Sequence, residues 1–562
     1  MITRFSIVTL VVFIVSIFFV IVPVRIPRTH ISLNLTTAPI LAIAILWAAQ
    51  CLGPSVIRGG IVGSEGIKPY NIIILFFSLA YMAITLDVTG ILEAAAHWVR
   101  NKGGTNGQKV FIYFYILLTG ISVIVGNDPV ILTGTAFLTY YIKASKLVET
   151  AWIISEFSAA NTASMVLFVG NPTNVVICEG FGINNVAYSA YTIFPFLACI
   201  VFGFFALFLQ FRDDKYIQRT LPSKGDKKPR DFLLDPIGAL VGGILLGSCL
   251  AVMLVVSFFG VDVWMISLPF AIAKLIFDLG WDHWRYRNDK IKFHSDQTLV
   301  AEPEPKLSRG AEQTLVESQV QTVNGDIGLD ELKRSHNTLS SYGHNQPLPP
   351  ADSPAPMGSP PSTALPPTIT RSPSPIPRPF IGRQRFALAQ LDTRLQKHFY
   401  TLHTALPRLP FALVPFAFSQ FILVEALAHQ GWIDVFARWL DRASGLSIYP
   451  TIWLVGVLGV ILCNISGTNI GATILLTKVC RAANLPGPSL RAAAIALAVA
   501  SNIGAVSFTF SASLAGLLWK GILEQRGIHI KQRSFAFWNL LPITVMTAVG
   551  LAVVCIEMAI LY

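Results

Sequence analysis

Two polar clusters interrupt apolar segments of this chain, and both carry side chains that could bind an ion. One is Gly-Asn-Asp-Pro at 126–129, and the other is Asn-Ile-Ser-Gly-Thr-Asn at 464–469. Gly and Pro break a helix and free backbone amides and carbonyls, while Asn and Asp add side-chain oxygens. Only the first cluster contains a carboxylate. Asp128 is therefore the candidate to hold a cation or carry a coupling proton, and the alternative is that it caps the following helix.

Two further apolar segments are interrupted in the same way. One carries Asn-Thr-Ala-Ser at 161–164 and Gly-Asn-Pro-Thr-Asn at 170–174, and the other carries Asn-Ile-Gly at 502–504, then Thr509 and Ser513. Freed amides at helix starts suit an oxyanion or a polar hydroxide, and freed carbonyls with Asn oxygens suit sodium. Both ligand classes stay open. For Asn161 and Asn502 the alternative is a polar contact between helices.

The interrupted segments recur at one fixed offset. Each matched pair is separated by 341 residues: Gly90 and Gly431 (431−90), Trp98 and Trp439 (439−98), Gly126 and Gly467 (467−126), Asn161 and Asn502 (502−161). In a membrane protein, broken apolar segments at corresponding positions of two halves point to the substrate site of a transporter.

The composition favours a polytopic membrane protein. Hydrophobic residues make up 53% of the 562 residues and charged residues only 13%, against about 25% charged residues in soluble domains. The net charge of +11 comes mainly from basic residues at the ends of apolar runs, which excludes nucleic-acid binding as the main function. The seven cysteines lie in or beside apolar segments without a CxxC pair, and indicate neither a disulfide framework nor a metal site.

Apolar runs of about 20 residues predict membrane-spanning helices. Ten are expected, near 5–24, 32–54, 71–89, 150–180, 190–211, 236–259, 262–280, 408–428, 490–519 and 538–561. The stretches 110–143 and 449–480 predict re-entrant hairpins, and 91–100 and 432–443 predict amphipathic interfacial helices. Five spans and one hairpin in each half make the two repeats inverted. The basic residues favour a non-cytoplasmic N-terminus.

The expected organisation has five parts. These are a first repeat (1–211), a cytoplasmic linker (212–235), the start of the second repeat (236–280), a disordered Pro/Ser-rich cytoplasmic loop (281–407) and the rest of the second repeat (408–562). The loop is either a passive linker or a regulatory tether, since kinases could modify its Ser-Pro sites within 353–374. Its length and Ser/Pro bias favour a eukaryotic, fungal-like source.

The motifs resemble a superfamily of ion transporters. It includes the arsenical pump membrane protein, NhaD-type sodium/proton antiporters, the melanosomal P protein and the citrate and dicarboxylate carriers. Residues 170–174 resemble the Gly-Asp-Pro-Pro-Asn motif of the arsenical pump, with Asn171 for the Asp and Thr173 for the second Pro. Residues 502–519 resemble the second broken helix of that protein, with Phe510 and Ala512 for a Pro and a Gly. The resemblance implies that the hairpins and broken helices move together against a scaffold.

We therefore expect an all-α secondary transporter that moves a small ion or oxyanion by alternating access, either an arsenite- or antimonite-like species or sodium in exchange for protons. A citrate or dicarboxylate carrier and a non-transporting sensor are the alternatives, and the sequence places no Arg near the site that would favour a tricarboxylate. The expected binding residues are Asn127, Asp128, Asn161, Ser164, Asn171, Thr173, Asn174, Thr468, Asn469, Asn502, Thr509 and Ser513.

The chemistry expected of these residues is not enzymatic. No cofactor and no catalytic metal are expected, and the coupling ion is H⁺ or Na⁺, the latter held by Asn127, Asn171, Asn174 and Asn469. The expected partners are the substrate and the lipid bilayer of a plasma or organelle membrane, with a homodimer as a further expectation and no nucleic acid.

Overall fold

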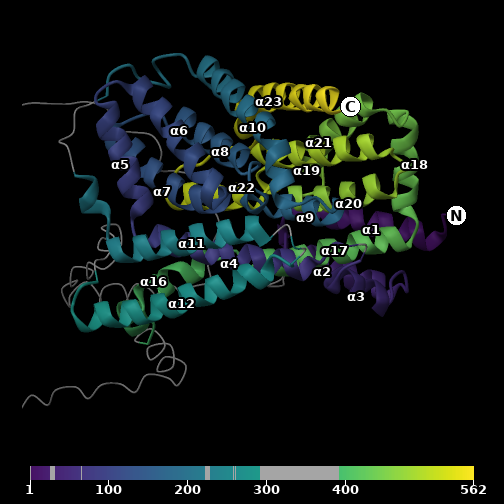
Figure 1. Ribbon diagram of the computed structural model, residues 1–562, viewed down its shortest axis with the longest axis horizontal. Helices are drawn as coiled ribbons and strands as arrows, with labels where there is room; N and C mark the ends of the chain where they lie inside the picture. The colour runs from purple at the N-terminus through teal and green to yellow at the C-terminus, as the bar shows by residue number, and fades with distance from the viewer. Residues whose placement is uncertain are drawn as a thin grey trace, which may run out of the picture. The chain divides into compact units, whose positions relative to one another are not determined.

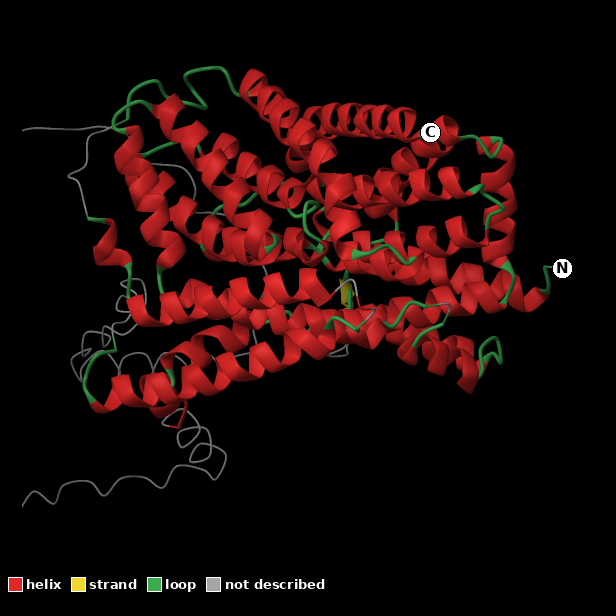
Figure 2. Ribbon diagram, viewed as in Figure 1, coloured by secondary structure: helices red, strands yellow, loops and turns green. Residues whose placement is uncertain are grey.

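The computed structural model describes residues 2–25, 32–64, 66–221, 228–256, 259, 261–291 and 391–562. These residues belong to one compact unit, Met1–Lys292 with Leu391–Tyr562. Within the described residues the fold is helical, with a single two-stranded ribbon of β1 (Val24–Arg25) and β2 (Ser32–Leu33), antiparallel and with Val24 opposite Leu33. Figure 2 shows this dominance of helix.

The helices follow the apolar runs. The first group is α1 (Arg4–Ile21), α2 (Thr37–Ala48), α3 (Pro54–Val62), α4 (Pro69–Val88), α5 (Ile91–Gly103), α6 (Gly107–Val125), α7 (Asn127–Ser145), α8 (Glu149–Ala163), η1 (Phe168–Gly170), α9 (Pro172–Phe181) and α10 (Asn185–Gln210). The second group is η2 (Pro229–Phe232), α11 (Pro236–Val256), α12 (Trp264–Arg287), α16 (Tyr400–Ala405), η4 (Leu406–Arg408), α17 (Leu413–His429), α18 (Trp432–Ser444), α19 (Ile448–Ile465), α20 (Asn469–Ala482), α21 (Gly487–Val506), η5 (Phe510–Ala512), α22 (Leu514–Gln525) and α23 (Gln532–Leu561).

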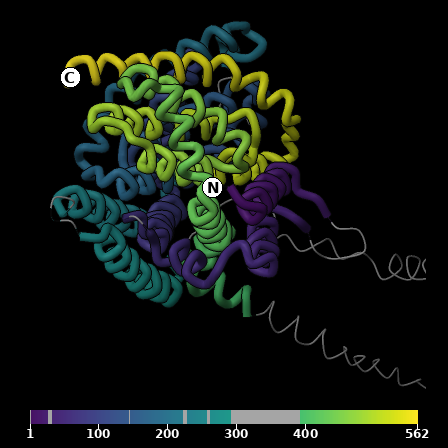
Figure 3. Tube along the Cα trace, turned by 90° about the vertical axis from the view of Figure 1, so that its right-hand side faces the viewer, coloured from purple at the N-terminus to yellow at the C-terminus, as the bar shows by residue number. Residues whose placement is uncertain are grey.

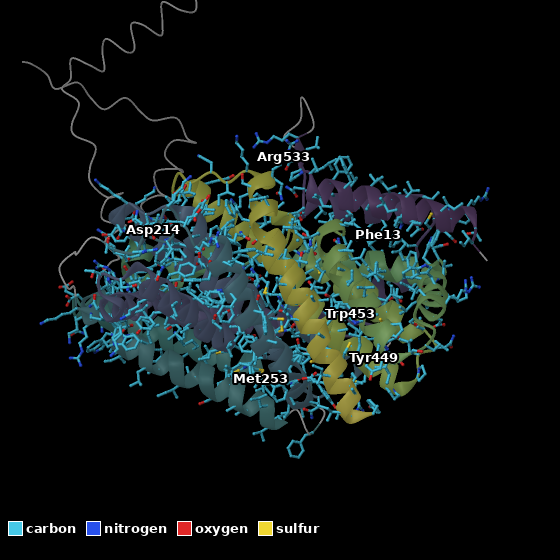
Figure 4. All side chains as sticks on the ribbon, turned by 90° about the horizontal axis from the view of Figure 1, so that it is seen from above. Phe13, Asp214, Met253, Tyr449, Trp453 and Arg533 are labelled. Carbon is cyan, nitrogen blue, oxygen red and sulfur yellow. The ribbon has the colours of Figure 1, made fainter. Side chains whose placement is uncertain are left out.

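Ten of the described helical segments are long and apolar enough to cross a membrane. They are α1, α4, α6, α10, α11, α12, Tyr400–His429, α19, α21 and α23. Their outward faces are apolar, as Tyr449 and Trp453 on α19 illustrate with exposed fractions of 50% and 41% (Figure 4). A protein that exposes such faces buries them in lipid, so the chain is a multi-pass membrane protein.

Four expected segments differ from the helices, and one of them, the span at 490–519, divides into α21 and α22 around η5. The expected span at 32–54 contains only the 12-residue α2, because Gln50 takes a left-handed φ of 56° and Pro54 starts a new helix. The expected span at 150–180 divides into α8 and α9 around η1. The expected loop at 281–407 is shorter, because α12 continues to Arg287 and α16 already begins at Tyr400; residues 292–390 lie outside the described part.

The offset of 341 residues seen in the sequence recurs in the helices. α18 spans the residues that the offset assigns to α5 (91 + 341 = 432, 103 + 341 = 444). Each of these helices follows a glycine in the left-handed region, Gly90 at φ 83° and Gly431 at φ 78°. After α21 the offset becomes 342, since η1 begins at Phe168 and η5 at Phe510. The inverted orientation of the repeats stays a prediction.

Two groups of helices can be followed in Figure 1. α4 packs against α11, α12 and α17, and α17 packs against α2 and α3. The returning helices of the hairpins contact the broken helix of the other half, so that α7 packs against α22 and α20 against α9. Figure 3 shows α1 close to the segment that carries α17, and the Trp432 Nε1 donates to the Ser6 carbonyl at 2.7 Å. Each repeat therefore completes the core of the other.

Candidate functional site

Four helices begin at one buried pocket. Its walls are Phe76, Asn127, Asp128, Asn171, Pro172, Leu413, Asn469, Ile470, Ser513, Leu514 and Ala515. These residues include the first residues or caps of α7, α9, α20 and α22. The first turn of a helix has backbone N–H groups without a partner in the helix, and the peptide dipoles make that end positive. The pocket is therefore surrounded by positive helix ends from both halves of the chain.

Side chains cap three of these four helices. The Asn171 Oδ1 accepts a hydrogen bond from the Thr173 N–H at 3.2 Å, and the Ser513 Oγ accepts one from the Gly516 N–H at 3.0 Å. The Thr468 Oγ1 accepts one from the Gly471 N–H at 3.3 Å. α7 differs, because its cap is Gly126 and no side chain makes a capping hydrogen bond there. The suggestion that Asp128 caps α7 is therefore wrong.

Asp128 is the carboxylate of the pocket. It is 8% exposed, and among the described residues no hydrogen-bond donor or cation pairs with its side chain. The corresponding residue of the second half is Asn469 (469−128 = 341). An unpaired carboxylate in a buried site is stabilised by binding a proton or a cation. The two halves therefore place an ionisable group and a neutral amide at equivalent positions.

A chain of hydrogen bonds behind the pocket joins the first hairpin tip to the two broken helices. The Asn127 Nδ2 donates to the Asn161 Oδ1 at 3.0 Å, and the Ser164 Oγ donates to the Asn161 carbonyl at 2.8 Å. The same hydroxyl lies 3.0 Å from the Asn502 Oδ1, and the Asn502 Nδ2 donates to the Asn174 Oδ1 at 2.8 Å. Asn161, Ser164, Asn174 and Asn502 are all fully buried. They hold the breaks in register and do not line the pocket.

The expected binding residues thus separate into groups. Five line the pocket: Asn127, Asp128, Asn171, Asn469 and Ser513. Thr468 caps α20. The hydroxyls of Thr173 and Thr509 are buried without a hydrogen-bond partner among the described residues, as is the Asn171 Nδ2. Of the four asparagines expected to hold sodium, Asn174 lies outside the pocket because Asn502 and two carbonyls take up its amide.

The sequence-based expectation that no Arg lies near the site is wrong. A second pocket shares Phe76, Asn127 and Asp128 with the first, and Arg408 forms part of its wall. The Arg408 Nη1 lies 3.1 Å from the Asp87 Oδ2. The Asp87 side chain is only 6% exposed. The sequence signal was Pro-Arg-Leu-Pro at 407–410, a basic residue between prolines directly before an apolar run.

Two further carboxylates in the membrane-spanning part, Asp278 and Glu425, are paired with lysines. Lys274 and Asp278, four residues apart on α12, form a buried ion pair, and the Tyr81 hydroxyl donates to Asp278 at 2.9 Å. Glu425 accepts a hydrogen bond from the Lys478 Nζ at 2.7 Å and one from the Ser64 Oγ at 2.8 Å. These pairs neutralise charges away from the central pocket.

Several ion pairs lie near the first residues of α4. Ser64, Glu425 and Lys478 meet there, and near them the Lys68 Nζ lies 2.7 Å from Asp262, which raises the pKa of Lys68. Lys68 precedes α4 and Asp87 lies at its other end, about 28 Å away for 19 residues at 1.5 Å each. Arg408 and Lys68 therefore lie at opposite ends of α4, and Phe76, between these ends, lines the central pocket.

Comparisons with known proteins follow this geometry. The family described as Citrate transporter matches residues 2–285, half of the chain. The chain belongs to the citrate transporter family. This membership agrees with the ten apolar spans and with the expected superfamily.

The individual proteins that match this member of the citrate transporter family have low sequence identity to it. The arsenical pump membrane protein of Escherichia coli K12 is 26% identical over 243 residues, 41% of this chain and 55% of that protein. The protein of the same name from Yersinia enterocolitica is 27% identical over 239 residues, with the same coverage. The chain thus spans about half the length of the curated relatives it matches. The crystal structure of the YdaH transporter from Alcanivorax borkumensis is 12% identical and covers 99% of this chain and 98% of its own, with a TM-score of 0.42.

Proposed function

We propose that this protein is a secondary active transporter that moves a small oxyacid or its anion across a membrane by alternating access. The observation that carries the proposal is the meeting of four helix N-termini at one buried pocket. Oriented amides and positive helix ends favour the oxygen atoms of an anion or of a polar hydroxide. Arsenite-like oxyacids and carboxylates both belong to this chemical class, and the names of the relatives and of the family point to each in turn.

Asp128 supplies the coupling in this proposal. A negative carboxylate in the pocket repels an anionic substrate, whereas the protonated acid can donate a hydrogen bond to it. Binding of the anion and binding of the proton then favour each other, which couples the two fluxes. The hairpins α6–α7 and α19–α20 and the broken helices would move together past α4 and α17.

Sodium/proton exchange is the second candidate, because amide groups accompany the carboxylate. Asn127, Asn171 and Asn469 line the same pocket as Asp128, and Na⁺ is bound by such oxygens. The four positive helix ends oppose a cation, so Na⁺ would require the Asp128 charge as well. Among the described residues, no group of three or more His, Cys, Asp or Glu could hold a metal ion.

A flux experiment tests the proposal. Purified protein in liposomes is offered arsenite, citrate or sodium, with and without a pH gradient. For the accepted substrate, Asp128→Asn should reduce gradient-driven flux at least tenfold while counterflow of the substrate persists. The matched control is Asp434→Asn, which changes an exposed carboxylate on α18. Wild-type coupling in the Asp128→Asn protein would remove the coupling role of this residue.

A further inference from the structure

The pocket next to the central one offers a cationic group to a ligand. Its walls include Arg408 together with Phe76, Asn127 and Asp128. Three of these residues also line the central pocket, so the two spaces are contiguous at Asp128. Apart from Arg408 and the hairpin tip, the walls are apolar. Apolar walls strengthen the attraction between a fixed cation and an anion.

The surroundings of Arg408 leave its guanidinium available. One nitrogen, Nη1, contacts Asp87 at 3.1 Å, and within the described part of the chain this is its one hydrogen bond. A guanidinium has five N–H donors and binds carboxylates and oxyanions through two parallel hydrogen bonds. The arginine side chain is 39% exposed, whereas Asp87 is 6% exposed. The carboxylate of this pair is thus buried, while part of the arginine side chain stays accessible.

We infer that this second pocket is an entry site for anions, with Arg408 as its binding residue. The site takes a small anion with carboxylate or oxyanion oxygens, which it passes to the central pocket at Asp128. This inference rests on the proposed function and deepens it. It adds a first binding step at the Asp87 end of α4, and it names Arg408 as the residue that selects the substrate there.

Asp87 has a defined part in this step. Arg408 and Asp128 line the same space, and an unrestrained arginine could pair with Asp128 and neutralise it. The contact with Asp87 holds the guanidinium away from Asp128. When an anion enters, the guanidinium releases the Asp87 carboxylate and binds the oxygens of the anion instead. Because the pair contacts through a single nitrogen, a ligand can bind the remaining donors before the contact with Asp87 breaks.

The test compares anionic and neutral substrates in liposomes at pH 7. Citrate and arsenate are anions, and arsenous acid is neutral. Arg408→Gln should raise KM for the transported anion roughly 10- to 100-fold, the equivalent of one lost charge-assisted hydrogen-bond pair, with kcat changed less than twofold. Arg408→Lys should recover part of the loss. Arg438→Gln, which changes an exposed arginine on α18, should have no effect.

The double variant Asp87→Asn/Arg408→Gln separates binding from folding. It removes the buried charge together with its arginine partner, so a structural role predicts recovery of wild-type KM. The entry-site inference predicts that KM stays raised in the double variant and that Asp87→Asn alone does not raise it. Recovery in the double variant, or an equal loss for neutral arsenous acid, would overturn the inference.

Calorimetric titration of citrate and arsenate into purified protein distinguishes this inference from the proposed function. Weaker anion binding by Arg408→Gln than by wild type supports the entry site even if liposome flux fails, in which case only the proposed transport is wrong. Equal anion affinities, or no binding to either protein, overturn the entry site whatever the flux shows.

Discussion

The Asn502 side chain donates a hydrogen bond from Nδ2 to the Asn174 Oδ1 at 2.8 Å, and so ties the broken helix of one half to that of the other. Asn174 in turn donates to the carbonyls of Ser164 and Leu167 at 2.8 and 2.9 Å. These carbonyls belong to the interrupted backbone between α8 and α9, where the Leu167 carbonyl also accepts a hydrogen bond from the Gly170 N–H at 2.9 Å. The two asparagines thus supply hydrogen-bond partners to the interrupted backbone. The groups that line the pocket are not needed for this and can bind a ligand.

Replacing Asn502 should destabilise the protein. Asn502→Ala removes the donor to Asn174 and the acceptor for Ser164 in a fully buried setting, and each buried polar group left without a partner costs about 1–3 kcal/mol. We expect a lower Tm in detergent and reduced yield. Asn288→Ala, at an exposed position after α12, is the control. A wild-type Tm for Asn502→Ala would contradict the structural role.

The caps of the broken helices should be interchangeable. Asn171 caps α9 as Ser513 caps α22, so Asn171→Ser should keep the helix start, while Asn171→Ala should cost about 1 kcal/mol. Thermal unfolding of the two variants checks the difference. If the Asn171 amide also binds substrate, Asn171→Ser will be stable yet show a raised KM, which separates capping from binding.

Gly126 should tolerate no side chain. Its φ is +85°, and a Cβ there would lie 2.9 Å from the Gly170 carbonyl oxygen. Gly126→Ala therefore strains the backbone and pushes the first hairpin tip away from η1, and we expect lost transport. Gly120→Ala on the same hairpin meets nothing within 4 Å and should be neutral or stabilising by about 0.5–1 kcal/mol. Equal transport by both variants would show that the close approach at Gly126 is unimportant.

The pair of Lys478 and Glu425 should behave as a unit. Lys478→Met leaves Glu425 with its Ser64 hydrogen bond but without the cation, whereas Lys478→Met/Glu425→Met replaces the pair with apolar groups of similar length. Removing one partner of a poorly solvated pair costs more than replacing both. The double variant should therefore unfold at a higher temperature than the single one, as measured by fluorescence-detected melting. The reverse order would mean that other contacts of Lys478 dominate.

The sequence predicted the site better than it predicted the ends of the helices. The repeat located both hairpin tips and both broken helices, because Gly, Asn and Pro in apolar runs have strong local effects. Five of the expected binding residues line the pocket, among them Asp128 and Asn469. The pattern could not tell them from Asn161 and Asn502, because which face of a helix meets the pocket depends on packing between helices.

Arg408 and Asp87 show a second limit of the sequence. They are 321 residues apart, and each resembles an ordinary interfacial charge at the end of an apolar run. Their contact arises because η4 places Arg408 beside the end of α4, which no local pattern encodes. The 12-residue α2 was missed for a different reason, since apolarity alone does not reveal where Gln50 ends a helix.

The ion pairs at the Lys68 end of α4 have a kinetic consequence. In the proposed alternating-access cycle, opening the central pocket at that end would separate the helices that carry Lys478 and Glu425 and break their contact. The enthalpy of breaking these contacts is then part of the activation barrier for one direction of the conformational change. Turnover should rise steeply on warming for the half-cycle that opens this end, whereas the half-cycle that opens at Arg408, with its single contact, should respond more weakly.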